Sequence, residues 1–254
     1  MISLKTPQEI KIMKEGGKRL ALVSQKILKE VCLGVQLNAL NNLADELIKK
    51  QGGFPSFKMV KGYHWATCLS VNQGVVHGIP GSYRVKEGDL ISLDIGIFFK
   101  GFHTDMANTI RVDSQNNVRS KDKFLEAGKK ALCRAIAQAK PGNRVGHISA
   151  VIGQQIRAAG YSPIRALTGH GIGRELHEDP QIPCYLRKNL NKTELIKPGM
   201  TFAIEVIYAQ GKPNLVLSSD GWTIKTADNS LAALFENTIA VTQNGPIVLT
   251  STEN

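Results

Sequence analysis

The sequence has few cysteines, no long apolar run and no signal-peptide core, and each shortage excludes a class of protein. Its four cysteines, at positions 32, 68, 133 and 184, form no C-x-x-C pair, which argues against a zinc ribbon or a disulfide framework and fits a reducing compartment. No apolar run approaches the roughly 20 residues of a membrane-spanning helix. Residues 1–9 begin a polar region, so we expect a cytoplasmic protein that does not insert into a membrane.

The chain is basic, but its positive charge is not concentrated. The formal net charge is +11, and the basic residues are spread along the chain rather than gathered in an arm or patch. This pattern argues against a dedicated nucleic-acid binder. A solvated protein surface is the simpler interpretation of the charge. The more specific alternative is a transient association with RNA at the ribosome. The length suits a single large domain over residues 1–254, and we expect a monomer.

Helical signals open the chain and return after residue 120. Thr6 can cap a helix that begins at Pro7, and Glu9 completes a capping box. Apolar residues then recur at helical spacing, and Gly34 is a stop signal. The same reasoning predicts further helices over residues 38–50, 121–139 and 145–159.

Strict alternation of apolar and polar residues replaces the helical period in two regions. Residues 91–97 place Ile and Leu on one face, with Asp94 on the other. The turn signal Lys100-Gly101 joins this strand to a second one over 102–112, which makes a hairpin. Two more strands are predicted over 202–208 and 234–241. The order of helices, sheet, helices and sheet indicates an α+β fold of two similar halves.

Four carboxylates interrupt these apolar strands: Asp94, Asp105, Glu205 and Glu236. Burying an unpaired carboxylate costs several kcal/mol in lost hydration, and no matching set of Lys or Arg lies in the strands. A divalent metal is therefore the economical partner. For each residue taken singly, the alternative is a strand position that faces solvent, which is the commoner case.

A histidine between glycines completes the candidate ligand set. The glycines around His170 leave the backbone free to approach a ligand closely. One imidazole with four carboxylates is a hard, oxygen-rich set, which suits iron, manganese, cobalt or zinc in a two-metal site better than a structural zinc site. If the first hairpin turns at Lys100-Gly101, Asp94 and Asp105 lie on one side of the sheet.

Eight short segments match one known family in order and spacing. They are CLSVN at 68–72, HGIP at 77–80, LDI at 93–95, GFHTD at 101–105, GHGIG at 169–173, HEDP at 177–180, PGMTF at 198–202 and ENT at 236–238. On these segments the chain resembles the type I methionine aminopeptidases, in their short bacterial form without an N-terminal zinc-binding extension. The resemblance implies the pita-bread fold, with two pseudo-symmetric halves and a central antiparallel sheet flanked by helices.

The resemblance also implies the activity, which is removal of the initiator methionine from nascent polypeptides when the second residue is small. Asp94, Asp105, His170, Glu205 and Glu236 would hold two divalent ions, with Asp105 and Glu236 bridging them. Two ions activate a water and clamp the oxygens of the reacting peptide bond. Glu205 would also carry a proton.

Two more histidines and a methionine pocket follow from the same match. His177 would hydrogen-bond the scissile carbonyl, and His77 would contact the backbone just after methionine. Cys68, Tyr63 and Trp222 match pocket positions, where a soft sulfur and aromatic edges suit a thioether. The alternatives are a polar turn residue for His77 and ordinary packing for the three pocket residues.

Three positions depart from the usual bacterial pattern. Leu176 stands where many relatives carry Phe, Val206 stands where Pro is customary, and Asn237 stands where His is frequent. We expect Asn237 to point away from Glu236, because neighbouring strand residues face opposite sides. No predicted ligand is lost, so we expect a working enzyme. It could be the main methionine aminopeptidase of its cell or a secondary paralogue.

Two other functions remain open at this point. A proline-specific aminopeptidase or prolidase would share the metal ligands, although such enzymes carry an extra N-terminal domain for which we expect no room here. A non-catalytic module that binds RNA or protein would fit the basic charge, but the intact ligand set argues against it.

Overall fold

A strongly bent antiparallel sheet forms the centre of the molecule, which we describe from a computed structural model for residues 2–112, 119–187 and 189–252. Ten strands belong to this sheet, and its main path runs in the order β1-β4-β5-β12-β9-β7-β8. The four long strands at its middle are β4 (Leu90–Phe99), β5 (Phe102–Arg111), β9 (Thr201–Ala209) and β12 (Ala232–Thr242). All strand pairs among the described residues are antiparallel.

Short strands and turns complete the fold around the long ones. They are β1 (Phe54–Pro55), β2 (Thr67–Val71), β3 (Gly74–Val76), β6 (Ser162–Pro163), β7 (Thr168–Gly171), β8 (Glu178–Pro183), β10 (Leu215–Leu217), β11 (Ile224–Thr226) and β13 (Gly245–Val248), with single 3-10 turns at Ser56–Met59 and Leu190–Lys192. Strands β10, β11 and β3 form a separate small sheet.

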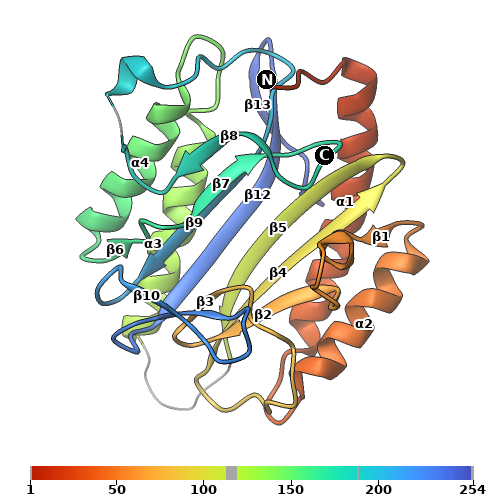
Figure 1. Ribbon diagram of the computed structural model, residues 1–254, viewed down its shortest axis with the longest axis vertical. Coiled ribbons are helices and arrows are strands. Elements are labelled where there is room, and N and C mark those ends of the chain that lie inside the picture. The colour runs from red at the N-terminus through yellow and green to blue at the C-terminus, as the bar shows by residue number, and fades with distance from the viewer. Residues whose placement is uncertain (1, 113–118, 188, 253–254) are drawn as a thin grey trace.

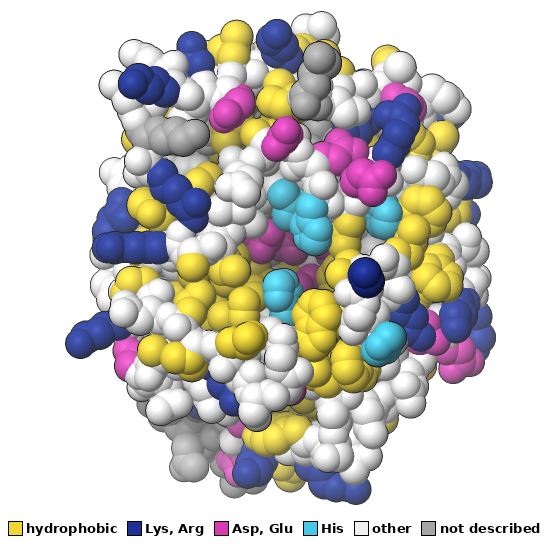
Figure 2. Space-filling model, in the orientation of Figure 1, with side chains coloured by type: hydrophobic (Ala, Val, Ile, Leu, Met, Phe, Trp, Pro, Cys, Tyr) yellow, Lys and Arg dark blue, Asp and Glu magenta, His cyan; other side chains and the backbone are white. Residues whose placement is uncertain are grey.

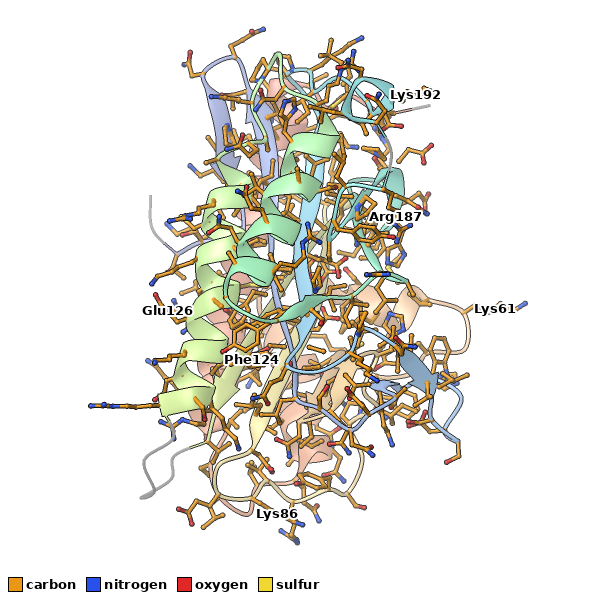
Figure 3. The ribbon with its side chains drawn as sticks, turned by 90° about the vertical axis from the view of Figure 1, so that its left-hand side faces the viewer. Lys61, Lys86, Phe124, Glu126, Arg187 and Lys192 are labelled. Carbon is orange, nitrogen blue, oxygen red and sulfur yellow. The ribbon has the colours of Figure 1, made fainter. Side chains whose placement is uncertain are left out.

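The helices pack behind one face of the sheet and leave the other face open (Figure 1). Helices α1 (Pro7–Glu30) and α2 (Leu37–Lys50) cover the first hairpin, while α3 (Arg119–Ile136) and α4 (Val145–Ala158) cover the half built on β9 and β12. Figure 3 shows Phe124 between α3 and the sheet, and Lys61 projecting from the opposite side. The predicted α+β architecture of two similar halves is confirmed.

Local signals set the first helix as predicted. Glu9 N donates to Thr6 Oγ1 at 3.3 Å, and Thr6 N donates to the Glu9 carboxylate at 2.7 Å, which closes the capping box. The apolar stripe of α1 then buries Met13, Leu20 and Ile27 against the sheet.

The turn of the first hairpin fixes the register of its two strands. Lys100 and Gly101 have φ values of 48° and 89°, so both occupy the left-handed region that a two-residue hairpin loop requires. Phe99 therefore pairs with Phe102, which places Asp105 opposite Gly96 and beside the strand position of Asp94. Because the side-chain period is two, both carboxylates lie on one side of the sheet, as predicted.

The second half brings two more carboxylates to the same side. Strands β9 and β12 pair so that Glu205 lies directly opposite Glu236. Strand β12 also pairs with β5, with Glu236 opposite Ala107. The contact between β5 and β12 is thus the seam between the halves, and the carboxylates gather along it.

The structure differs from the sequence prediction at the end of one helix and in the short strands. The third helix ends at Ile136 rather than at residue 139, because the chain tightens into turns in which Gln138 N donates to Ala135 O at 3.0 Å. The short strands carry too few residues to show a period. None of the helices in the described residues combines the length and the apolar character that spanning a bilayer requires.

Replacing Gly101 by Ala should lower the free energy of unfolding by about 1–2 kcal/mol, since a Cβ is strained at its φ of 89°. Urea denaturation measures the change. Gly81→Ala is the matched control: Gly81 lies outside the left-handed region, and the nearest atom to an added Cβ, Ile79 O, is 4.0 Å away. The control should be neutral or gain up to about 1 kcal/mol, and equal losses in both variants would contradict the assigned strain.

Candidate metal centre

The five predicted ligands meet in one cavity on the open face of the sheet. The cavity has a volume of about 140 Å³, and its walls include all five side chains: Asp94, Asp105, His170, Glu205 and Glu236. Figure 2 shows acidic side chains at the bottom of a central hollow, with histidines at its edge and apolar side chains around it. A larger cavity of about 340 Å³ between α4 and β8 contains none of the five.

Distances define the centre of the cluster. Asp105, His170 and Glu236 each offer one ligand atom, and these three atoms lie within 4.8 Å of one another. His170 Nε2 is 3.6 Å from Glu205 Oε1. Asp105, His170 and Glu236 are buried, and Asp94 and Glu205 are half-buried. A group this close could share a pair of cations.

Burial shifts the pKa of every group in the cluster toward the neutral form. Burial raises the pKa of Asp94 to about 7. Burial, together with the charge of neighbouring carboxylates, raises the pKa values of Asp105, Glu205 and Glu236 well above their usual range. Burial lowers the pKa of His170 to about 3, so its imidazole is neutral at physiological pH and can offer a lone pair.

The unsatisfied atoms of the cluster fit divalent cations. Asp94 Oδ1 and Glu236 Oε1 are buried without a hydrogen-bond partner, which is expensive unless a ligand is bound. Within the described ranges, none of the ion pairs joins Lys or Arg to these four carboxylates. His170 Nδ1 lies 2.8 Å from Gly171 O, which assigns its proton to Nδ1 and turns the Nε2 lone pair toward the carboxylates.

Contacts with neighbouring strands hold the backbone of the ligand residues in place. Thr238 Oγ1 accepts from Asp105 N at 2.8 Å and donates to Asp105 O at 2.7 Å, so one hydroxyl clamps the backbone of this ligand. The glycines beside His170 serve close packing of strands: an added Cβ at Gly169 would lie 2.5 Å from Ala203 O, and one at Gly171 would lie 2.1 Å from Asp179 O. Their role is thus to admit neighbouring strands, rather than to admit a ligand as the sequence suggested.

His177 and His77 stand at the opening of the cavity. Both are exposed and both line it. The His177 ring lies edge-on to that of His170, with ring centroids 4.5 Å apart. His77 has a φ of 55°, a left-handed conformation that costs about 1 kcal/mol or more for a residue with a Cβ and is often held in place at functional sites.

The remaining wall of the cavity is apolar and aromatic. Tyr63 packs edge-on against Trp222, with ring centroids 5.1 Å apart, and its hydroxyl donates to Thr67 O at 2.9 Å. Cys68 is buried, and burial raises the pKa of its thiol well above the usual value, so the sulfur stays neutral. Leu176 lines the same wall. These residues therefore form a pocket for an apolar side chain beside the carboxylates.

Several residues around the cavity were not predicted from the sequence. Phe57 and Val60 line the apolar wall from the 3-10 turn and the bend after it, where no period exists to reveal them. His103 is buried beside the site, where its Nδ1 lies 2.9 Å from Ser56 Oγ and burial lowers its pKa to about 4. In the sequence, only the spacing of two residues between His103 and Asp105, which puts both on one face of their strand, indicated that His103 lies near the site.

The structure accommodates the departures from the family pattern at Val206 and Asn237 without loss of a ligand. Asn237 Oδ1 accepts from Thr250 Oγ1 at 2.9 Å, on the side away from the cluster, as predicted. Val206 pairs with Phe235 in the regular β9–β12 ladder, and its side chain is buried in the main core behind the sheet. Glu205 keeps its position in the strand without a proline beside it.

Comparisons with known proteins agree with this geometry. The model of metallopeptidase family M24 matches residues 11–243. Methionine aminopeptidase 1 of Bacillus subtilis (strain 168) is 42% identical over 251 residues, covering 98% of this chain and 99% of the relative. The crystal structure of methionine aminopeptidase from Thermotoga maritima matches with a TM-score of 0.94 at 40% identity, over 99% of this chain and 100% of that one. The chain belongs to the methionine aminopeptidases of family M24.

Membership of M24 confirms a metal-dependent aminopeptidase with the pita-bread fold, as the sequence predicted. The methionine aminopeptidase of Escherichia coli (strain K12) is 36% identical over 251 residues, covering 98% of this chain and 94% of the relative. Prolidase from Pyrococcus furiosus matches with a TM-score of 0.78 at 24% identity, over 99% of this chain and 66% of the prolidase. That likeness shows the shared fold alone.

The raised carboxyl pKa values predict how stability depends on pH when no metal is bound. A carboxyl with a higher pKa in the folded state binds more protons when folded, so the free energy of unfolding falls as pH rises. Above about pH 7 the histidines are largely neutral in both states and no longer oppose this trend. The metal-free M24 protein should then lose about 1.4 kcal/mol per pH unit for each carboxyl still protonated when folded.

Urea denaturation of metal-free protein between about pH 7 and pH 8.5 measures this slope. Asp105→Asn should remove one such contribution, since burial and neighbouring charge raise the pKa of Asp105. Glu46→Gln is the control, because the side chain of Glu46 is 60% exposed and pairs with Lys50 on the surface. A slope in Asp105→Asn equal to that of the unchanged protein would contradict the prediction.

Proposed function

We propose that the protein holds two divalent ions and removes the initiator methionine from nascent polypeptides whose second residue is small. The observation that carries the proposal is the union, in one small cavity, of five ligand side chains with an apolar wall of Tyr63, Cys68 and Trp222. The ligands that would hold the hydrolytic metal ions therefore lie next to an apolar pocket for the methionine side chain. The relatives named methionine aminopeptidase support this substrate.

The donor set would hold iron, manganese, cobalt or zinc. Asp94, Asp105, His170, Glu205 and Glu236 would be the ligands, with Asp105 and Glu236 shared between two ions, since these two carboxylates lie at the seam where both halves meet. When bound, the ions supply Lewis acidity that activates water as a nucleophile at neutral pH. The carboxylates then stay ionised, because the cations offset the repulsion that otherwise keeps them protonated.

Three side chains would handle the substrate and its protons. Glu205 lies within the cluster, where it can accept a proton from the attacking water and pass it to the leaving amine. His177 would donate a hydrogen bond to the scissile carbonyl as negative charge develops on that oxygen. His77, across the opening, would contact the peptide backbone after methionine.

The shape of the cavity supports the choice of substrate. The neutral Cys68 sulfur and the aromatic edges of Tyr63 and Trp222 suit the polarizable thioether of methionine. The volume of about 140 Å³ suits one apolar side chain beside the ligands, and the small second residue is the part of the proposal that the family resemblance supplies. Nascent N-termini are thus the proposed partners. A cytoplasmic monomer with transient ribosome contact remains a prediction from the sequence.

Peptide hydrolysis by metal-stripped protein tests the substrate and the cofactor together. With iron, manganese, cobalt or zinc added back, the tripeptide Met-Ala-Ser should be cleaved and Met-Leu-Ser should be cleaved much more slowly. Titration of each metal against activity should reach its plateau at two ions per chain. Faster turnover of X-Pro peptides would instead assign a prolidase activity, and RNA binding without hydrolysis would favour a binding module.

Two substitutions separate metal binding from stabilisation of the transition state. Asp94→Asn should abolish metal-dependent hydrolysis and lower the affinity for the added metal. His177→Ala should retain the metal but lower kcat by about 10²–10³-fold, the usual loss for one oxyanion donor. Asp122→Asn is the control, since it removes an exposed carboxylate paired with Arg111 and should leave both measurements unchanged. Full activity of Asp94→Asn would refute the ligand assignment.

A further inference from the structure

The loop that carries His177 has little regular structure of its own. Residues 173–177 form successive bends between β7 and β8. The carboxylate of Glu178, the next residue, closes this loop: its Oε1 accepts from Arg174 N at 2.8 Å and from Glu175 N at 3.3 Å. The position of His177 therefore depends on where the Glu178 side chain is fixed.

Lys5 fixes Glu178 from a distant part of the sequence. The Lys5 ammonium donates to the second carboxylate oxygen of Glu178, and the Lys5 side chain is only 1% exposed, against 12% for Glu178. The backbone of Lys5 is also anchored, since its N–H donates to Gly199 O at 2.7 Å. The N-terminal segment thus places one buried cation against the base of the loop.

The glycine at the start of the loop makes this contact possible. An added Cβ at Gly173 would lie 2.2 Å from Lys5 Cε and 2.8 Å from Glu178 Oε1, so any larger residue would displace the ion pair. Gly173 O also accepts from His103 N at 2.7 Å, which ties the loop to β5 and to the strand of Asp105. The loop is held on both sides by buried contacts.

We propose that Lys5, acting through Glu178, is a positioning residue that holds His177 over the metal cluster. A buried ion pair adds little net stability, because the desolvation of both charges offsets their attraction, so stability alone does not explain it. The pair does fix the carboxylate that closes the loop next to His177. The effect of Lys5 on the reaction rests on the proposed function, whereas its effect on the closure of the loop does not.

A second ion pair on the same loop provides a matched control. Arg174 pairs with Glu9, and the Arg174 side chain is 56% exposed against 18% for Glu9, so the cation of this pair lies in solvent, unlike that of Lys5. Exposed pairs contribute little to structure, because water screens both charges. Glu9→Gln keeps the capping role at the start of α1 and should leave kcat unchanged.

A double-mutant cycle on peptide hydrolysis tests the proposal. Lys5→Met should lower kcat by about 10- to 100-fold, the loss expected from a misplaced reacting group, with KM changed by less than about threefold. In the His177→Ala background, Lys5→Met should cause no further loss of kcat, because its effect runs through His177. The same loss in both backgrounds would overturn the proposal.

Hydrogen exchange on the metal-free protein supplies a measurement that does not depend on catalysis. In Lys5→Met the amides of Arg174 and Glu175 should exchange about tenfold faster, while those of α1 and β12 keep their rates. Faster exchange throughout the molecule, or unchanged exchange in the loop, would overturn the proposal. Glu178→Gln, which retains size, should reproduce both results and serves if Lys5→Met does not fold.

The two proposals fail in different ways. If His177→Ala hydrolyses peptides as fast as the unchanged protein, the role given to His177 in the proposed function is wrong. The exchange rates at Arg174 and Glu175 still decide whether Lys5 fixes the loop. If His177→Ala is slow but Lys5→Met is fast, only the positioning role of Lys5 is refuted.

Discussion

The constraint around which the rest of the structure is arranged is the gathering of four carboxylates in one small cavity. Burial raises the pKa of all four, and the charge of neighbouring carboxylates raises those of Asp105, Glu205 and Glu236 further. The apolar faces of the same strands supply the offsetting free energy, because they pack against the helices behind the sheet. This packing keeps the four groups together when no metal is bound, and under the proposed function bound cations would lower the cost of ionising them.

The parts of the site predicted from the sequence are those set by short-range rules. Alternation placed Asp94 and Asp105 on long strands, and the turn at Lys100-Gly101 determined their register. Alternation also placed Glu205 and Glu236 on strands, but that they meet was implied only by the family resemblance and depends on the pairing of β9 with β12. In each case the pattern of a single hairpin or strand pair decides which way the side chain points.

The parts not predicted depend on contacts between distant segments. Strand β7, which carries His170, is too short and too rich in glycine to show a period, and β8 has two prolines among its six residues. Phe57 enters the pocket from a 3-10 turn. The contact of Lys5 with Glu178 joins residues 173 positions apart, and nothing in either local sequence announces it. Motif matching named His177 but gave no indication of what holds it.

The seam between β5 and β12 divides the proposed ligand set between the two halves of the molecule. Asp94 and Asp105 come from one half, while His170, Glu205 and Glu236 come from the other, so bound cations would act as a cross-link between the halves. Neither half by itself carries the full coordination set. Separating β5 from β12 would therefore divide the coordination set between two pieces of sheet, so metal affinity should depend on the hydrogen bonds of this one strand pair.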